Sequence, residues 1–537
     1  MATHTPESRL SAWLRRWCIL VGAAAALLPA MVWLSADYGV TWDEPARQRY
    51  GLRIWEFYQG RHGYERFPAD GTHLYAGLFD VTAVALQKAL PFDPYVIRHA
   101  LNAVFGWVGI ACCGALAARL GGRRAGLLAM LLLALAPRYF GHSMNNPKDI
   151  PFAALAAASL VPIAAIRPQY PWLPPRVAAG LAITIGLALS VRPGGLLLLL
   201  YAGGALAFAI ARARDFALRR LLITAATFTA VALVATTIPL PVWPWLQQHP
   251  YAGLLEAVAG VSRFDWNGRV LFDGQSIRAA GVPWSYVPVW LLYTTPPVVL
   301  LGALLSLARL RRSPGRVAAG GLWFACLFPV AYVIAKESTL YDGIRHLLFI
   351  LPPLIALAAL GWTWLIDRTS GAGRLAAALL LAVGLAEPLV FQMRNHPNQV
   401  VYFNHLLGGP RAAFGRFDLD YWGNCLRQAV VEAEALAREA EMVVLVSGRR
   451  LQLLQLNAAR THVVRGIPAR LERHHLEVTL FRGPPSGLAK AAARRDVVYR
   501  IAMADGTPIC SVTRGPRFAE LRRRLPAGFR RPSPESR

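Results

Sequence analysis

The stretch RAGLLAMLLLALAPRYFGHSMNNPKDIPFAALAAASLVPIAAI, residues 124–166, places two long apolar runs on either side of a short polar segment. Each run approaches the length, roughly 17 to 25 residues, that a helix needs to cross a lipid bilayer. The segment between them sets Lys148 and Asp149 between two prolines. Because ionisable groups at the edge of the hydrocarbon are costly, they indicate chemistry or a polar partner. The stretch therefore predicts a membrane protein with a functional loop.

The composition of the whole chain agrees with this prediction. Of its 537 residues, 55% are hydrophobic and 16% are charged, and the mean hydropathy is +0.37. Such a chain is too apolar for an ordinary soluble globule. The first apolar run lacks a small-residue cleavage site and many more follow, so it predicts a retained helix and not a signal peptide. Runs of spanning length predict about eleven transmembrane helices, at about 17–36, 98–118, 124–140, 150–166, 177–191, 194–211, 220–239, 285–308, 317–335, 346–366 and 373–392.

Arginines in the short loops predict the orientation, because positively charged loops stay in the cytoplasm. Arg15 and Arg16 precede the first span, and arginines recur in every second loop after it. This pattern predicts a cytoplasmic N-terminus in a bacterial-type inner membrane. The loops expected to face outward are those at about 37–97, 141–149, 192–194, 241–284 and 336–345, together with the chain after about 393.

The predicted domains are a transmembrane domain at 1–395, a small extracytoplasmic α/β domain at 396–520 and a basic, disordered tail at 521–537. The first outward loop contains EPARQRYGLRIWEFYQG and LYAGLFDVTAVALQKAL, whose apolar spacing predicts two helices on the membrane surface. The loop at 241–284, rich in Trp, Pro and Gly, predicts irregular structure. In the C-terminal domain we expect a helix at 424–440, strands at EMVVLVSG and LEVTLF, and a hairpin at DVVYRIAMADGTPICSV.

The charge and the cysteine content limit the kinds of partner that the chain is expected to have. The chain carries 57 Lys and Arg against 30 Asp and Glu, an excess that favours attraction to anionic lipid. No nucleic-acid-binding motif is present. Cys425 and Cys510 both fall in the outward C-terminal region, where a disulfide between them is a hypothesis. No cysteine spacing is typical of a zinc site.

Polar residues gather at the predicted outer ends of the spans. They are Asp43 and Glu44, Lys148 and Asp149, Arg192, and the group Lys336, Glu337, Asp342, Arg345 and His346. Carboxylates and cations at one interface suit a substrate with a lipid tail and an anionic head. Structural explanations stay open: the acidic residues can cap helices, and the arginines can extend toward the membrane surface.

Three motifs in this set resemble a known family. TWDEPAR after the first span, NNPKDIPF after the third and YDGIRHLLFILPP entering a late span look like the type C glycosyltransferases, of the protein O-mannosyltransferase and lipid A aminoarabinose transferase kind. The resemblance covers residues 15–395 and leaves the subfamily open. It implies transfer of a sugar from a polyprenyl-phosphate donor to a hydroxyl acceptor at the outer face of the bilayer, with inversion at the anomeric carbon.

The resemblance also implies roles for individual residues. Asp43 matches the general base, and Asp149 matches an acidic residue that orients the acceptor or positions Asp43. Glu44 accompanies them as a candidate catalytic residue. The candidates for holding the donor phosphate are Lys148, Arg192, Arg345 and His346.

No cofactor is firmly implied. Some relatives bind a divalent metal through acids of these loops, but Lys148 beside Asp149 already supplies positive charge, so a metal is not favoured. Two other functions stay open, transport or lipid flipping, and a non-catalytic scaffold that binds anionic polymers. A need for the Asp43 carboxylate would separate the transferase from both.

Overall fold

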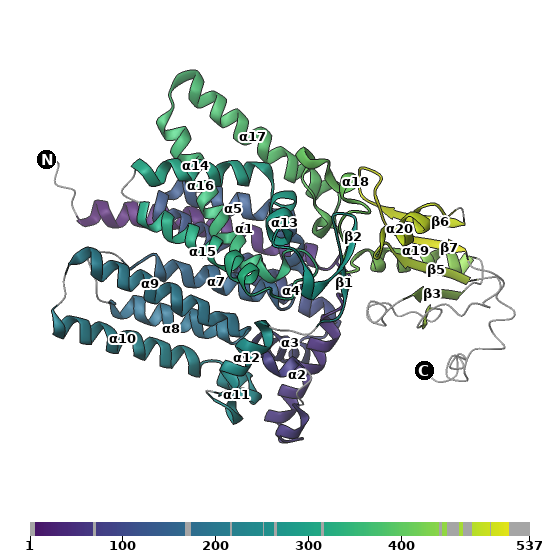
Figure 1. The fold of residues 1–537 in the computed structure, drawn as a ribbon, viewed down its shortest axis with the longest axis horizontal. Coiled ribbons are helices and arrows are strands. Elements are labelled where there is room, and N and C mark those ends of the chain that lie inside the picture. The colour runs from purple at the N-terminus through teal and green to yellow at the C-terminus, as the bar shows by residue number, and fades with distance from the viewer. Residues whose placement is uncertain are drawn as a thin grey trace. The chain divides into compact units, whose positions relative to one another are not determined.

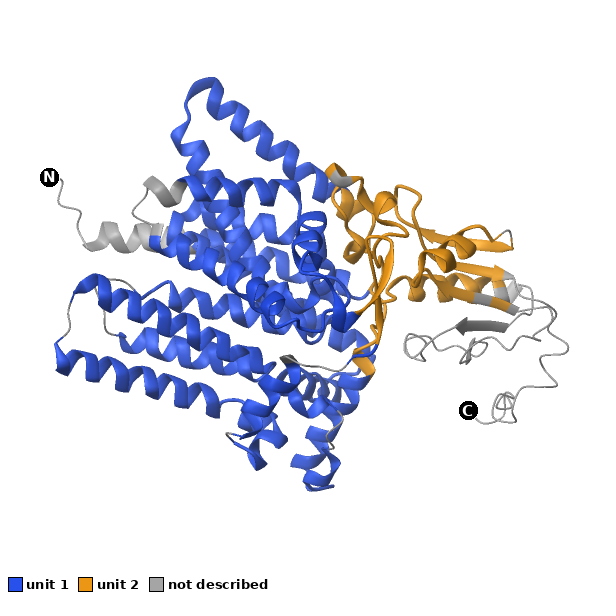
Figure 2. Cartoon of the chain, in the orientation of Figure 1, with its two compact units in different colours: residues 1–36, 46–267, 279–390 blue, residues 37–45, 268–278, 391–537 orange. Residues whose placement is uncertain are grey.

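The computed structural model describes residues 6–67, 71–166, 173–214, 217–250, 252–262, 266–312, 316–439, 443–447, 461–464, 475–494 and 496–514. The predicted tail at 521–537 lies outside these residues. The chain divides into two compact units, coloured separately in Figure 2. Unit 1 comprises residues 1–36, 46–267 and 279–390, and unit 2 comprises residues 37–45, 268–278 and 391–537.

Unit 1 is helical (Figure 1). Its α-helices, of which α2 begins and α17 ends in residues of unit 2, are α1 (Pro6–Ser35), α2 (Glu44–Tyr58), α3 (Leu78–Ala89), α4 (Pro94–Gly121), α5 (Arg123–Ala134), α6 (Pro137–Asn145), α7 (Asp149–Ile163), α8 (Pro175–Leu189), α9 (Leu196–Ala213), α10 (Leu218–Thr237), α11 (Pro244–Gln248), α12 (Ala252–Ser262), α13 (Tyr286–Thr294), α14 (Pro297–Arg312), α15 (Arg316–Ala335), α16 (Leu351–Arg368) and α17 (Gly371–Arg394). Short 3₁₀ turns are η1 (Tyr64–Arg66), η2 (Thr72–Leu74), η3 (Pro193–Gly195), η4 (Leu240–Val242), η5 (Ala279–Gly281) and η6 (Arg345–Ile350).

Seven helices of the described chain are long and apolar enough to cross a membrane, and nine if two bent pairs each count as one span. The pairs are α5 with α6, bent by 67°, and α13 with α14, bent by 111°. The chain is thus a polytopic membrane protein. Helices α7 and α8 lie at the fourth and fifth of the eleven predicted spans, and each has 15 residues. A 15-residue helix is only about 22 Å long, which is less than the hydrocarbon thickness of about 30 Å.

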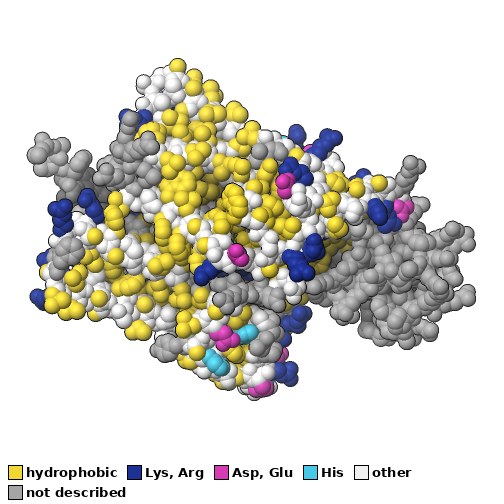
Figure 3. All heavy atoms as spheres, in the orientation of Figure 1, with side chains coloured by type: hydrophobic (Ala, Val, Ile, Leu, Met, Phe, Trp, Pro, Cys, Tyr) yellow, Lys and Arg dark blue, Asp and Glu magenta, His cyan; other side chains and the backbone are white. Residues whose placement is uncertain are grey.

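The centre of unit 1 forms around α4 and α16. Helix α4 packs against α1, α5, α6 and α7, while α16 packs against α14, α5 and α4. Glycine lets the backbones of α14 and α16 approach closely, because a side chain on Gly361 would clash with the carbonyl oxygen of Gly302. Hydrophobic side chains cover much of the face of unit 1 in view (Figure 3), as expected of helices that contact lipid.

The start of α4 follows from its sequence. The Asp93 side chain accepts hydrogen bonds from the backbone N–H groups of Tyr95 and Val96, at 2.8 and 3.3 Å. Pro94 occupies the first helical position, where its missing N–H is not needed.

The two helices predicted in the first loop are confirmed as α2 and α3.

The prediction of irregular structure for the loop at 241–284 is wrong in part. Residues 244–248 and 252–262 form the short helices α11 and α12, and a hairpin of β1 (Arg269–Phe272) and β2 (Gln275–Arg278) follows. Asp273 and Gly274 join these strands with φ angles of 48° and 80°. An Asp-Gly pair adopts such positive φ angles readily, so the hairpin signal was present in the sequence. The hairpin belongs to unit 2.

Unit 2 combines this hairpin with a five-stranded mixed sheet. The strand order is β4-β3-β5-β7-β6, with β3 parallel to β4 and β5, and β7 antiparallel to β5 and β6. The predicted C-terminal helix, strands and hairpin are confirmed. The remaining elements of unit 2 are η7 (Gln399–Val401), η8 (His405–Leu407), α18 (Gly409–Ala413), α19 (Cys425–Glu439), β3 (Val443–Ser447), β4 (Thr461–Val464), β5 (His475–Leu480), α20 (Pro485–Ala492), β6 (Val497–Ala502) and β7 (Pro508–Arg514).

A disulfide links Cys425 at the start of α19 to Cys510 in β7. Their Cα atoms are 6.0 Å apart, and the bridge closes a loop across a sequence separation of 85. Both residues are buried, and the bond fastens the helix to β7, an inner strand of the sheet. The pairing considered from the sequence is therefore present in the structure.

Candidate active site

Asp149 is the centre of a buried polar cluster in unit 1. Arg192, on the segment before η3, donates from Nη2 to Oδ1 of Asp149. Asn146 donates from Nδ2 to Oδ2 at 2.9 Å, and its own Oδ1 accepts the backbone N–H of Asp149 at 3.0 Å. Asn146 thus caps the first turn of α7 and orients the carboxylate at the same time. Arg192 and Asp149 are both buried, so this ion pair is shielded from water.

Tyr75, which follows η2, brings further cations to the cluster. The Lys148 Nζ atom lies 4.7 Å from the centre of the Tyr75 ring, and the Arg192 and Arg47 guanidinium carbons lie at 5.9 and 5.8 Å. Tyr50 fixes the segment by donating its hydroxyl to the Tyr75 carbonyl at 2.9 Å. A ring face attracts cations, and three converging like charges favour an anionic ligand.

Arg345 and His346 reach the cluster from η6. Both lie within electrostatic range of the Asp149 carboxylate, as does Lys148. The Arg345 Nε atom is 3.5 Å from Oδ2 of Asp342, and its guanidinium lies 4.6 Å from the centre of the Tyr341 ring. The Tyr341 ring also contacts the edge of His346, at 4.6 Å between centroids. Unit 1 therefore gathers five of the sequence-predicted site residues, Lys148, Asp149, Arg192, Arg345 and His346.

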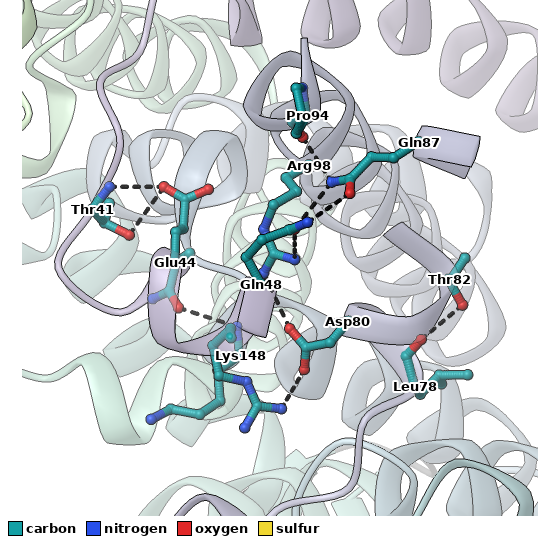
Figure 4. Close-up of polar contacts among 12 residues, drawn as sticks. Thr41, Glu44, Gln48, Leu78, Asp80, Thr82, Gln87, Pro94, Arg98 and Lys148 are labelled. Carbon is teal, nitrogen blue, oxygen red and sulfur yellow. Dashed lines mark hydrogen bonds and ion pairs between the residues drawn. The ribbon is translucent and has the colours of Figure 1, made fainter. Parts of the chain in front are cut away.

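A second buried ion cluster adjoins the first through Arg47. Asp80 of α3 accepts from Arg47 and, at 3.1 Å, from Arg98 of α4. Gln48 accepts from Arg98 at 3.2 Å and exchanges hydrogen bonds with Gln87 (Figure 4). Burial lowers the pKa of Arg47, but the Asp80 carboxylate together with Tyr50 and Tyr75 raises it by more, so the pKa lies above its ordinary value. Arg47 is thus a permanent cation beside Tyr75.

Glu44 and Asp43 lie in unit 2 and differ from each other in environment. The buried Glu44 carboxylate accepts from the backbone N–H of Thr41 at 2.7 Å and from its hydroxyl at 3.2 Å (Figure 4). Glu44 thereby closes a capping arrangement at the start of α2, which agrees with the structural explanation considered for it. Asp43, one residue earlier, is only partly buried.

Two of the three acidic residues considered for a metal ion, Glu44 and Asp149, accept hydrogen bonds from protein groups. Asp149 directs one oxygen to Arg192 and the other to Asn146, both of which are donors, and Glu44 is bound to Thr41. A divalent cation needs oxygen ligands that are open to it. Among the residues that the structure describes, no three His, Cys, Asp or Glu side chains group as a metal site would require.

Sequence reasoning missed several residues of the two clusters. They are Tyr75, Asn146, His142, Arg47, Asp80 and Arg98. Asn146 had a signal, because an Asn three residues before an acidic residue is typical of a helix start. Asp80 and Arg98 also had one, since each is a charge within an apolar stretch. His142 is found through Asn146, whose Nδ2 lies 3.0 Å from the His142 Nδ1. Tyr75 had no signal, because aromatic residues are common in such loops.

Comparison with known proteins gives structural matches only. No protein-family model matches the chain, and no curated protein sequence does.

Two crystal structures of ArnT from Cupriavidus metallidurans match nearly the whole chain. The structure bound to undecaprenyl phosphate is 15% identical with a TM-score of 0.48, covering 92% of this chain and 97% of that one. The apo structure is 16% identical with a TM-score of 0.47, covering 94% and 98%.

The apo oligosaccharyltransferase of Archaeoglobus fulgidus also matches, at 12% identity and a TM-score of 0.41, over 79% of this chain and 62% of that one. Because the TM-scores of these three structures are below 0.5, the function is proposed from the residues of the site.

Proposed function

We propose that the chain is a membrane glycosyltransferase that moves a sugar from a polyprenyl-phosphate-linked donor to a hydroxyl acceptor. The observation that supports this most strongly is the state of Arg192. Its Nη2 holds Asp149, while its buried Nε–H meets no acceptor among the described residues. An unsatisfied buried donor is costly, and a phosphate oxygen is an acceptor whose geometry matches a guanidinium.

The other cations extend the phosphate site. Lys148 and Arg47 share the Tyr75 ring with Arg192, and Arg345 acts on the same Asp149 carboxylate. As the bond between the sugar and the phosphate breaks, negative charge grows on the phosphate. Fixed cations in a water-poor site stabilise that charge most in the transition state. Asp149 holds Arg192 in place and so serves as a positioning residue.

The base in this proposal is Asp43. Its carboxylate takes the proton of the acceptor hydroxyl, the hydroxyl oxygen bonds to the anomeric carbon, and the electron pair of the broken bond leaves with the polyprenyl phosphate. The environments of the acids support this choice. Glu44 and Asp149 are buried, whereas Asp43 is partly exposed, so that a substrate can reach its carboxylate. A base must be ionised and within reach of its substrate.

The predicted orientation is part of the proposal. With the N-terminus in the cytoplasm, the site and unit 2 face outward. The disulfide between Cys425 and Cys510 supports this, because such bonds persist in oxidising compartments. The proposal does not specify the donor sugar, nor whether the acceptor is a lipid, a glycan or a protein.

Binding of the lipid phosphate tests the proposed site. We would measure the affinity of a short-chain polyprenyl phosphate for the protein in nanodiscs of phosphatidylcholine. Arg192→Gln is expected to weaken binding about tenfold or more, the loss of a charge-assisted hydrogen bond. The matched control is Arg219→Gln, which removes an exposed arginine of the same unit. The proposed site is contradicted if both variants weaken lipid-phosphate binding equally, or if neither variant weakens it.

The activity itself is tested with a panel of radiolabelled polyprenyl-phosphate sugars and membranes as the source of acceptor. Label in the acceptor fraction, with release of polyprenyl phosphate, supports transfer and identifies the donor. A folded protein that transfers label from none of the donors contradicts the proposal and favours transport.

A further inference from the structure

Unit 2 contains a cavity of about 540 Å³ that the proposed transfer site does not use. Three elements supply its wall. Arg394 is the last residue of α17, Arg427 comes from α19, and Tyr499 and Arg500 come from β6. The volume of the cavity lies within the range of about 300 to 1,000 Å³ that is usual for small-molecule sites.

The charges of the wall favour an anion. Three arginines face two carboxylates, Asp37 and Glu432. Asp37 lies 2.8 Å from the Nε2 atom of His396, another lining residue. Arg500 donates to the backbone carbonyl of Ala492 at 3.2 Å, a contact that orients the guanidinium but leaves its charge. Guanidinium groups of this kind bind phosphate and carboxylate through paired hydrogen bonds.

The rest of the wall favours a saccharide. Tyr499 is 41% exposed although it belongs to a strand of the sheet, so a flat aromatic face is open to a ligand. Amide side chains lie with it: Asn395, Asn398 and Gln428 line the same cavity. Asn398 donates to Gln428 at 2.9 Å, which fixes both. Aromatic faces pack on the C–H faces of sugars, and amides hydrogen-bond to their hydroxyls.

We propose that this cavity binds an anionic saccharide, a sugar that carries a phosphate or carboxylate group. Two sources supply that chemistry, the head group of a glycolipid and a soluble glycan. The proposal is independent of sugar transfer, because binding is measured with no donor present.

The test is binding of glucose 6-phosphate to the full chain in phosphatidylcholine nanodiscs, beside glucose and inorganic phosphate. The double variant Arg394→Gln with Arg500→Gln removes two lining charges at exposed positions. This double variant is expected to weaken the binding of glucose 6-phosphate about tenfold or more. The matched control is Arg411→Gln, an exposed arginine of unit 2 outside the cavity, and it should leave binding unchanged.

A second variant tests the sugar. Tyr499→Ala should weaken the binding of glucose 6-phosphate but not that of inorganic phosphate, because only the sugar packs on the Tyr499 ring. Dodecyl glucoside 6-phosphate separates the two sources. If it binds more tightly than glucose 6-phosphate, the natural ligand is a glycolipid; if the two bind with equal affinity, the ligand is a soluble glycan. Either result supports the proposed site. The proposal is overturned if glucose 6-phosphate does not bind saturably, if glucose binds as tightly, or if the double variant behaves like Arg411→Gln.

Discussion

Arg192 donates a hydrogen bond to the Asp149 carboxylate across 43 residues of sequence, and so joins the two loops that flank α7 and α8. Asp149 begins α7, and Arg192 follows α8. Helices α7 and α8 pack against each other, which brings the end of one to the start of the other. The ion pair is the fixed point around which Lys148, Arg345 and Tyr75 are arranged.

This relationship makes a first prediction about geometry. Arg192→Lys keeps the charge but loses the fork of the guanidinium, so a single ammonium group must serve both Asp149 and the donor phosphate. We expect KM for the lipid-linked donor to rise about fivefold to tenfold, as measured by initial transfer rates. Arg219→Lys, at an exposed position, should leave KM unchanged. A donor KM that is the same in Arg192→Lys and wild type would contradict the role of the guanidinium.

The second prediction concerns Asp80, which stabilises two buried arginines. Asp80→Asn leaves Arg47 and Arg98 without their carboxylate, and the expected loss in the free energy of unfolding is about 3 to 5 kcal/mol. Denaturant unfolding in detergent micelles measures it.

The control for Asp80 is Asp367→Asn, which breaks the exposed pair with Arg124. Exposed pairs contribute at most about 1 kcal/mol. Equal, small losses in the two variants would mean that Asp80 is not buried as described.

The third prediction separates two neighbouring acids. Glu44→Gln removes the charge that accepts the Thr41 N–H, so it should cost about 1 kcal/mol of stability, as loss of a helix cap does. Turnover per folded molecule should stay close to wild type. Thermal unfolding and transfer assays on the same sample measure both. A variant of normal stability but no turnover would move the role of base to Glu44.

The fourth prediction concerns the disulfide. Cys510→Ser opens a bridge with a sequence separation of 85, and closing long loops of this kind contributes about 2 to 5 kcal/mol. We expect slower migration on a non-reducing gel and faster proteolysis of unit 2. Cys18→Ser, at a free and exposed cysteine, should change neither. Unchanged mobility of Cys510→Ser would show that the bond does not form.

The sequence predicted the elements whose signals are local. Apolar runs identified the long helices, and β-branched residues with an Asp-Gly turn identified the hairpin of β6 and β7. It also grouped Lys148, Asp149, Arg192, Arg345 and His346, because the order of loops along the chain predicts the same side of the membrane for all of them.

What the sequence could not provide depends on packing between distant segments. Arg47 and Arg98 come together only because α2, α3 and α4 meet around Asp80, and Tyr75 matters only because cations from other loops converge on it. The spans predicted at 150–166 and 177–191 correspond to the 15-residue helices α7 and α8. Burial explains the apolar sequence of α7 equally well, since α4 and α8 pack against it.

The central claim is that a carboxylate at position 43 removes the acceptor proton. Its most direct test is the single-turnover transfer rate from a bound polyprenyl-phosphate sugar, compared among wild type, Asp43→Asn and Glu44→Gln in identical nanodiscs. Loss of a general base predicts a fall of about 10²-fold to 10⁴-fold in Asp43→Asn, with donor binding and thermal stability unchanged and Glu44→Gln close to wild type. A wild-type rate in Asp43→Asn would contradict the claim.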